Sequence, residues 1–167
     1  MSTTPEVPNL PWAPDLPGLP EALWSGSGCA IVRGFPVDSF NDEETRRGYL
    51  EVATRLGRVV PQTVSGAIIY SVRDEGYQLQ RDYGQAGVRT SKTTSAFGFH
   101  TDSPSRLAGH TPDALGLLVL RTAKSGGESI YVDGRAVYRA IENERPDYLA
   151  RLSQPFWVDR RAELPPG

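Results

Sequence analysis

The first twenty residues of the chain carry a proline at every third position, from Pro5 to Pro20. Each proline fixes its own φ angle and lacks a backbone N–H, so this spacing opposes both a regular helix and ladder pairing. We therefore expect residues 1–27 to form an extended N-terminal arm ahead of a domain formed by residues 28–167. Apolar side chains between the prolines favour an arm that lies across the domain; they are Leu10, Trp12, Leu16 and Leu19.

The rest of the composition is typical of one ordinary globular domain. A length of 167 residues is enough for a hydrophobic core without disulfide or metal support. The 17 glycines and 14 prolines favour many turns and short strands over a helical bundle.

The charge and the cysteine content exclude several classes of protein. With 18 basic and 20 acidic residues the net charge is −2, which argues against nucleic-acid or anionic-membrane partners. We find no apolar run long enough for a membrane span and no signal-peptide pattern at the N-terminus. The single cysteine, Cys29, lies in an apolar run, so the expected location is the reducing cytoplasm.

Two helical regions are predicted. Residues 42–56 have apolar side chains at helical spacing, Asn41 and Glu44 are placed for a capping box, and Gly57 ends the helix. Residues 134–152 are predicted to form a pair of helices around Pro146.

Strands are predicted over residues 29–35, 58–62, 67–72, 114–120, 128–133 and 155–160. The run 114–120 is nearly all apolar, as expected for a strand buried on both faces. The polar stretch 73–96 is predicted to be a long loop.

The pair His100 and Asp102 is the feature with the clearest chemistry. In an extended segment, residues i and i+2 point to the same face, so the imidazole and the carboxylate converge. One histidine and one carboxylate, completed by a second histidine, form the ligand set of non-haem Fe(II) oxygenases. The alternative is a surface loop in which Asp102 accepts a hydrogen bond from His100. The preceding Phe97-Gly98-Phe99 segment favours an accessible metal site at a packed strand end.

Several motifs follow one another around this pair, in this order: Phe99-His100-Thr101-Asp102, Thr111-Pro112-Asp113, the run Leu115 to Leu120, Gly126-Gly127-Glu128-Ser129 and Val132-Asp133-Gly134. This order resembles the taurine dioxygenase-like (TauD/TfdA) family of Fe(II)- and 2-oxoglutarate-dependent dioxygenases. The resemblance covers about residues 28–161.

The resemblance implies an α+β, mostly β fold: a double-stranded β-helix (jelly roll, cupin-like) with flanking helices, incomplete at the C-terminus. It implies that His100 and Asp102 are the first two Fe(II) ligands. It also implies that the Ser129 hydroxyl helps to hold the far carboxylate of the co-substrate 2-oxoglutarate. The alternative for Ser129 is a polar residue on a half-exposed strand.

The chain also departs from the family pattern. A distal histidine and an arginine that pairs with 2-oxoglutarate are expected on strands beyond this region, so this chain alone is expected to be inactive. His110 lies too close to His100 in sequence to match that distal position. Three further carboxylates, Glu128, Asp133 and Asp159, are expected to be solvated or to cap helices.

Three hypotheses about function follow. The first is the N-terminal part of a dioxygenase that uses O₂ and a small-molecule substrate, whether as a truncated chain, a fragmentary gene product or one half of a split enzyme. The second is a non-catalytic cupin-like binding or scaffold domain. The third is a metalloenzyme that borrows ligands from a second subunit. A homo-oligomer or a complementing C-terminal half is the expected protein partner.

The polar loop could recognise the substrate. Basic residues in and around it are candidates to pair with an acidic substrate, and the alternative is a solvated loop in which the acids Asp74, Glu75 and Asp82 balance them. The basic residues are Arg73, Arg81, Arg89 and Arg106, and the aromatic residues around them are Tyr70, Tyr77, Tyr83 and Phe97. The identity of the substrate is not encoded in any recognisable motif.

Overall fold

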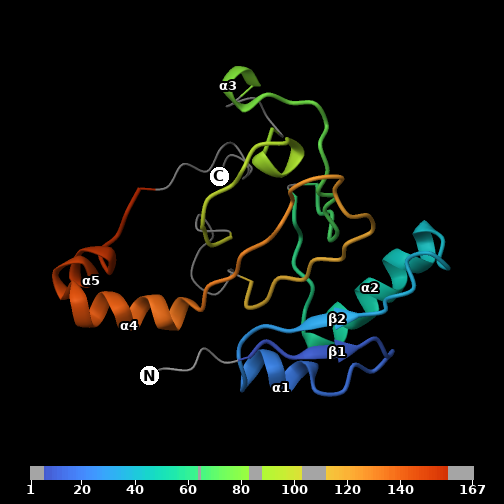
Figure 1. The fold of residues 1–167 in the computed structure, drawn as a ribbon, viewed down its shortest axis with the longest axis horizontal. Coiled ribbons are helices and arrows are strands. Elements are labelled where there is room, and N and C mark those ends of the chain that lie inside the picture. Colours follow the sequence, from blue (N-terminus) through green and yellow to red (C-terminus); the bar gives the residue numbers. More distant parts are fainter. Residues whose placement is uncertain (1–5, 64, 83–87, 103–111, 158–167) are drawn as a thin grey trace. The chain divides into compact units, whose positions relative to one another are not determined.

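The computed structural model describes residues 6–63, 65–82, 88–102 and 112–157. The chain forms two compact units, one from Met1–Arg58 with Ala114–Phe156 and the other from Val59–Asp113 with Trp157–Gly167. Among the described residues, the first unit contains β1 (Asn9–Pro11), α1 (Leu19–Trp24), β2 (Ile31–Arg33), α2 (Asp42–Leu56), α4 (Gly134–Glu144) and α5 (Pro146–Leu152) (Figure 1). The second contains α3 (Leu79–Asp82) and the 3₁₀ helix η1 (Thr90–Lys92).

The strands β1 and β2 form a two-stranded parallel sheet, with Leu10 opposite Val32 at the middle of the register. Parallel neighbours need a crossover connection, and α1 lies within the one that joins these strands (Figure 1). The strand predicted within residues 29–35 is confirmed by β2.

The expectation that the prolines prevent ladder pairing is wrong. The carbonyl of Pro8 accepts a hydrogen bond from the Ile31 N–H at 3.0 Å, and the Trp12 N–H donates to the Arg33 carbonyl at 2.7 Å. Pro8 precedes the strand and contributes only its carbonyl, and the N–H that bonds to Arg33 belongs to Trp12, the residue after Pro11. A parallel strand uses the N–H groups of alternate residues, so prolines at these positions remove no ladder bond.

A short helix, α1, also forms within the segment that was expected to be extended. It begins after Gly18, whose φ angle of 87° is in the left-handed region, and Pro20 occupies its first turn. Proline is tolerated there because the first N–H groups of a helix have no partner within the helix. Leu16 and Leu19 are only 3% and 7% exposed, as expected for side chains that cover the domain.

The helix α2 confirms the prediction for residues 42–56. The Asn41 side chain accepts hydrogen bonds from the N–H groups of Glu43 and Glu44 at 3.0 and 2.9 Å. The Glu44 carboxylate accepts in turn from the Asn41 N–H at 2.9 Å, which completes the capping box. Gly57 ends the helix.

Aromatic side chains from the β1 and β2 region pack against α2. The rings of Trp12 and Phe35 meet edge to face with centroids 4.5 Å apart, and those of Phe35 and Phe40 with centroids 5.9 Å apart. A Cβ on Gly48 would lie 3.2 Å from the Phe35 ring. The glycine therefore lets the aromatic cluster approach the helix closely.

The pair of helices predicted around Pro146 is confirmed by α4 and α5. Arg145 ends the first helix and Pro146 begins the second. None of the helices in the described ranges is long and apolar enough to cross a membrane.

The other predicted strands do not form within the described residues, where β1 and β2 make up the only sheet. The expected double-stranded β-helix is therefore not seen there. The described elements are mostly α-helices, from 4 residues in α3 to 15 in α2, so the prediction of a mostly β fold is not confirmed. In the run 114–120, Leu115 and Leu117 are both 58% exposed and Val119 is 64% exposed. Without a neighbouring strand the apolar pattern cannot produce the predicted buried strand. Part of the predicted strand 155–160 lies outside the described residues.

Substitution of Gly116 tests the packing of this run on α2. An ideal Cβ on Gly116 would lie 2.8 Å from the Tyr49 hydroxyl, so an alanine forces the ring or the segment to move. We expect Gly116→Ala to lower the free energy of unfolding by about 1–3 kcal/mol, as at other over-packed sites. Urea unfolding followed by circular dichroism measures this loss.

Gly134→Ala is the matched control, because a Cβ there meets nothing within 4 Å. In a Tyr49→Phe background, the cost of Gly116→Ala should shrink because the clashing hydroxyl is gone. Equal costs for Gly116→Ala and Gly134→Ala would show that the close approach does not exist in solution.

Candidate metal centre

The side chains of His100 and Asp102 converge, as their spacing predicts, although the segment is not a strand. His100 Nε2 lies 3.6 Å from Asp102 Oδ1. This distance is too long for a hydrogen bond, so the alternative in which Asp102 accepts one from His100 is not observed. Metal bonds from nitrogen or oxygen are about 2.0–2.2 Å long for zinc, so one ion could reach both atoms.

The imidazole of His100 is oriented by its own local chain. His100 Nδ1 lies 2.8 Å from the carbonyl oxygen of Gly98, and because a carbonyl only accepts, Nδ1 carries the proton. A neutral imidazole with its proton on Nδ1 has a lone pair on Nε2, the nitrogen that lies 3.6 Å from the carboxylate. The Phe97 ring lies against the imidazole with centroids 4.0 Å apart. A backbone carbonyl on the second ring nitrogen is the usual support of a metal-binding histidine.

The pair fits a divalent cation in donor type but supplies only two ligands. The His100 and Asp102 side chains are 43% and 50% exposed. Within the described ranges, no group of three or more histidine, cysteine, aspartate or glutamate side chains could hold a metal ion. His110 lies outside the described residues.

Ser129 lies in the other unit, exposed and two residues after a tight turn. Gly126 and Gly127 have φ angles of 69° and 83°, in the left-handed region that favours glycine, which agrees with the predicted turn. No hydrogen bond is found for the Ser129 hydroxyl among the described residues. It is therefore free to donate to a ligand.

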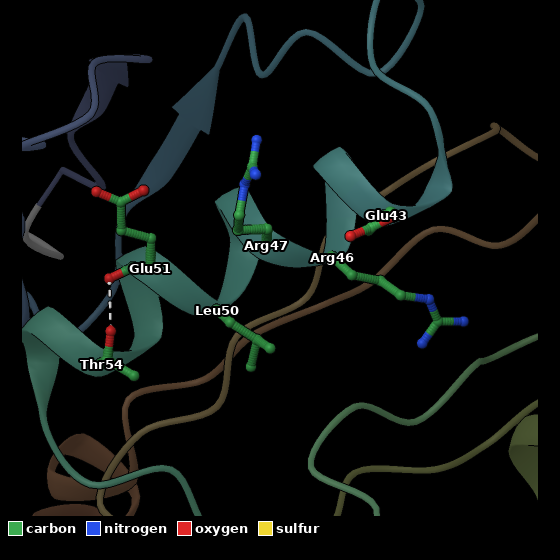
Figure 2. Close-up of a pocket in the computed structure, with 6 residues that line it drawn as sticks. All are labelled: Glu43, Arg46, Arg47, Leu50, Glu51 and Thr54. Carbon is green, nitrogen blue, oxygen red and sulfur yellow. Dashed lines mark hydrogen bonds between the residues drawn. The ribbon is translucent and has the colours of Figure 1, made fainter.

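A shallow open hollow on α2 holds none of the predicted site residues. Figure 2 shows that its lining comes from one helix, with the Arg46 and Arg47 side chains pointing away from each other. The Thr54 hydroxyl donates to the Glu51 carbonyl at 3.0 Å and so is already paired. The lining residues are Glu43, Arg46, Arg47, Leu50, Glu51 and Thr54.

Comparison with known proteins agrees with the motif order. Residues 10–166 match the family described as taurine catabolism dioxygenase TauD, TfdA family. The chain belongs to the TauD/TfdA family. It is therefore related to dioxygenases that are generally dependent on Fe(II) and 2-oxoglutarate.

A curated member of the same kind is similar to much of the chain. The FR-33289 synthase of Streptomyces rubellomurinus is 29% identical over 147 residues, which cover 88% of this chain. They cover 40% of the synthase, so the chain spans less than half the length of this relative. No solved structure matches the chain.

Within this TauD/TfdA chain, the polar stretch 73–96 contains α3 and η1 as well as loop. Its acids balance at least two of its basic residues: Arg73 lies 3.9 Å from Glu75, and Arg81 lies 2.7 Å from Asp82. Tyr83, Arg106 and most of the loop between α3 and η1 lie outside the described residues. Sequence reasoning missed Lys92, which pairs with Glu75 at 3.2 Å. No motif marks that pair, because its members are far apart in sequence.

Asp133 caps α4, as expected for a carboxylate without a metal role. Its Oδ1 accepts hydrogen bonds from the Arg135 N–H at 2.9 Å and from Arg135 Nε at 3.2 Å. These hydrogen bonds, first that from the backbone N–H, hold the pKa of the Asp133 carboxyl below its ordinary value of 3.8.

This shift predicts a pH-dependent contribution to stability. Because the pKa is lower in the folded state, the Asp133 carboxylate stabilises the fold above its unfolded pKa. That stability is lost as the pH falls through the lower, folded value. Asp133→Asn keeps a capping oxygen but cannot ionise. We expect the stability advantage of the unsubstituted chain over this variant to shrink between about pH 7 and about pH 3, measured by urea unfolding.

Asp113→Asn provides the control, because no hydrogen bond of the Asp113 side chain is found in the described ranges. An advantage over Asp133→Asn that stays constant across this pH range would contradict the charged cap.

Proposed function

We propose that His100 and Asp102 bind Fe(II) and that the chain is the N-terminal part of a 2-oxoglutarate-dependent dioxygenase. The observation that carries the proposal is the 3.6 Å approach of His100 Nε2 to Asp102 Oδ1, with the other ring nitrogen held by Gly98. Two acceptor atoms that face each other at this distance share no proton in the neutral ring, and a cation between them would satisfy both. Family membership supports the choice of iron over other divalent ions.

The proposed reaction is the hydroxylation, or a related C–H oxidation, of a small molecule. Fe(II) with 2-oxoglutarate and O₂ supplies the oxidising power, as 2-oxoglutarate is decarboxylated to succinate. The chain's own residues hold the ligand side chains in position. The Gly98 carbonyl keeps the proton on Nδ1 of His100, the Phe97 ring limits rotation of the imidazole, and Asp102 supplies negative charge toward the cation.

Ser129 is proposed to donate a hydrogen bond to the far carboxylate of 2-oxoglutarate. Its exposed hydroxyl has no partner among the described residues, and it follows a turn whose two glycines have φ angles in the left-handed region. An anion in this position needs donors, because an unpaired buried carboxylate is costly. The distal histidine and the arginine of the family pattern remain to be supplied, and without them the chain alone is proposed to be inactive.

The missing groups are proposed to come from a complementing C-terminal half. The relative's length supports this, since this chain spans only 40% of it. The same half would supply strands to the apolar run 114–120 and complete a double-stranded β-helix with flanking helices. Residues 1–27 would then be an arm on that domain. A cytoplasmic location is proposed from Cys29, which is free and half-buried.

A non-catalytic cupin-like binding or scaffold domain is the second candidate. It is favoured by the exposure of the His100 and Asp102 side chains and by the lack of a third metal ligand within the described part of the chain. The two candidates differ in two measurable properties: the scaffold binds no Fe(II) and consumes no 2-oxoglutarate. A site completed by a second subunit would instead make metal loading follow dimer formation.

Anaerobic Fe(II) titration by calorimetry tests the dioxygenase proposal. We expect weak binding by the chain, and His100→Gln or Asp102→Asn should reduce the affinity at least about tenfold because one of two ligands is lost. Addition of a C-terminal half should strengthen the binding.

His110→Gln is the matched control, since His110 is the other histidine of the chain. It should leave Fe(II) affinity unchanged. No Fe(II) binding with or without the C-terminal half would refute the proposal and leave the scaffold.

A further inference from the structure

Glu75 and Lys92 are joined by two contacts in the second unit. Lys92 Nζ lies 3.2 Å from Glu75 Oε2, and the Glu75 N–H donates to the Lys92 carbonyl at 2.9 Å. Their side chains are only 28% and 21% exposed, respectively, so the ion pair is more shielded than one between fully solvated groups. The carboxylate of Glu75 raises the pKa of the Lys92 ammonium, so Lys92 stays charged. Together these contacts hold Glu75 and Lys92 side by side.

Tyr70 adds a third contact to this pair. The Lys92 ammonium lies 5.8 Å from the centre of the Tyr70 ring, within the range of a cation–π interaction. The Ser91 hydroxyl donates to the Tyr70 hydroxyl at 3.5 Å. Lys92 therefore contacts two residues from earlier in the chain, Tyr70 and Glu75.

From Lys92 the chain runs to His100 through a series of local contacts. The N–H and the hydroxyl of Thr93 both donate to the Thr90 carbonyl, at 3.0 and 2.9 Å. The Ser95 N–H then donates to the Thr93 hydroxyl at 3.1 Å. The Phe97 ring packs on the His100 imidazole, as described above. These contacts hold the backbone from Thr90 to Ser95 in a local turn, and the Phe97 ring contacts the imidazole further along the chain.

We propose that the Glu75–Lys92 pair is a positioning element for the candidate iron site: it fixes the start of the segment that carries His100 and Asp102. The two side chains touch no ligand, and they act by limiting where the segment begins. This inference rests on the proposed Fe(II) site, and its consequence is a site whose affinity depends on an ion pair eight residues before the histidine.

Anaerobic Fe(II) calorimetry of four variants tests this role. Lys92→Met and Glu75→Gln should each weaken Fe(II) binding about two- to fivefold, the factor that loss of one partly exposed ion pair can supply. Lys92→Arg keeps the charge and should restore most of the affinity. Lys124→Met is the matched control, because Lys124 is the other lysine and has no ion pair among the described residues.

A double-mutant cycle separates the pair from its individual members. The variant with both Lys92→Met and Glu75→Gln should bind Fe(II) no more weakly than either single variant, because the interaction is already lost. Additive losses, or equal affinities for Lys92→Met and Lys124→Met, would overturn the positioning role.

A second readout needs no metal. At about pH 8, where histidine is ordinarily neutral, ¹⁵N NMR of the ring nitrogens reports which one carries the proton. The unsubstituted chain should show His100 protonated on Nδ1, and Lys92→Met should increase the Nε2-protonated fraction while helical circular dichroism stays constant. His100→Gln assigns the signals, since the chain has two histidines.

The two readouts distinguish the two proposals. If the unsubstituted chain does not bind Fe(II) with or without the C-terminal half, the proposed function fails, and the ring-nitrogen signals still decide whether Lys92 orients His100. Unchanged ring signals in a folded Lys92→Met variant would overturn the positioning role even if Fe(II) binds.

Discussion

The packing of the first unit depends on how closely other segments can approach α2. Gly48 lets the Phe35 ring lie against the helix on the side of the small sheet, and Gly116 leaves room for the Tyr49 hydroxyl. The burial that this packing produces also raises the pKa of Tyr49. At both places the contact is possible because glycine has no side chain. An added methyl group would fill the space that the aromatic residue uses. The helix is thus a common support for segments from both ends of the unit.

Local signals in the sequence predicted the helices well. Asn41, Glu44 and Gly57 specify the ends of α2 through groups within a few residues of one another, and Pro146 separates α4 from α5 for a similarly local reason. The small sheet was only half predictable. The apolar run around β2 indicated a strand, but its partner β1 was hidden by the prolines, since their effect depends on which backbone N–H groups face the neighbouring strand.

The longer predicted strands depend on partners that a local pattern does not identify. The run 114–120 has the composition of a doubly buried strand, yet three of its four leucines, Leu115, Leu117 and Leu120, are more than half exposed in this chain. Apolar composition shows that a segment can be buried against other apolar side chains. Strand formation also requires a second backbone with free hydrogen-bond donors and acceptors. The sequence therefore predicts a tendency at these positions, and the structure adds that no partner strand occurs in the described residues.

The candidate site was predictable at the level of its two side chains and less so in its support. The spacing of His100 and Asp102 indicated convergence, which the 3.6 Å distance bears out. The contacts of Gly98 and Lys92 could not be predicted, because Gly98 accepts through its backbone carbonyl and Lys92 pairs with an acid seventeen positions away. Side-chain identity shows which atoms can coordinate; the atoms that orient them are often part of the backbone.

The crossover between β1 and β2 links the proline-rich start of the chain to the rest of the unit. Among the described residues, β1 is the sole neighbour of β2, and Trp12, just after β1, contributes a ring to the cluster on α2. A chain shortened to begin at residue 28 would expose the backbone edge of β2 and uncover Phe35. The proline-rich segment is thus an integral part of the two-stranded sheet. A chain shortened for protein production should therefore begin before Pro8.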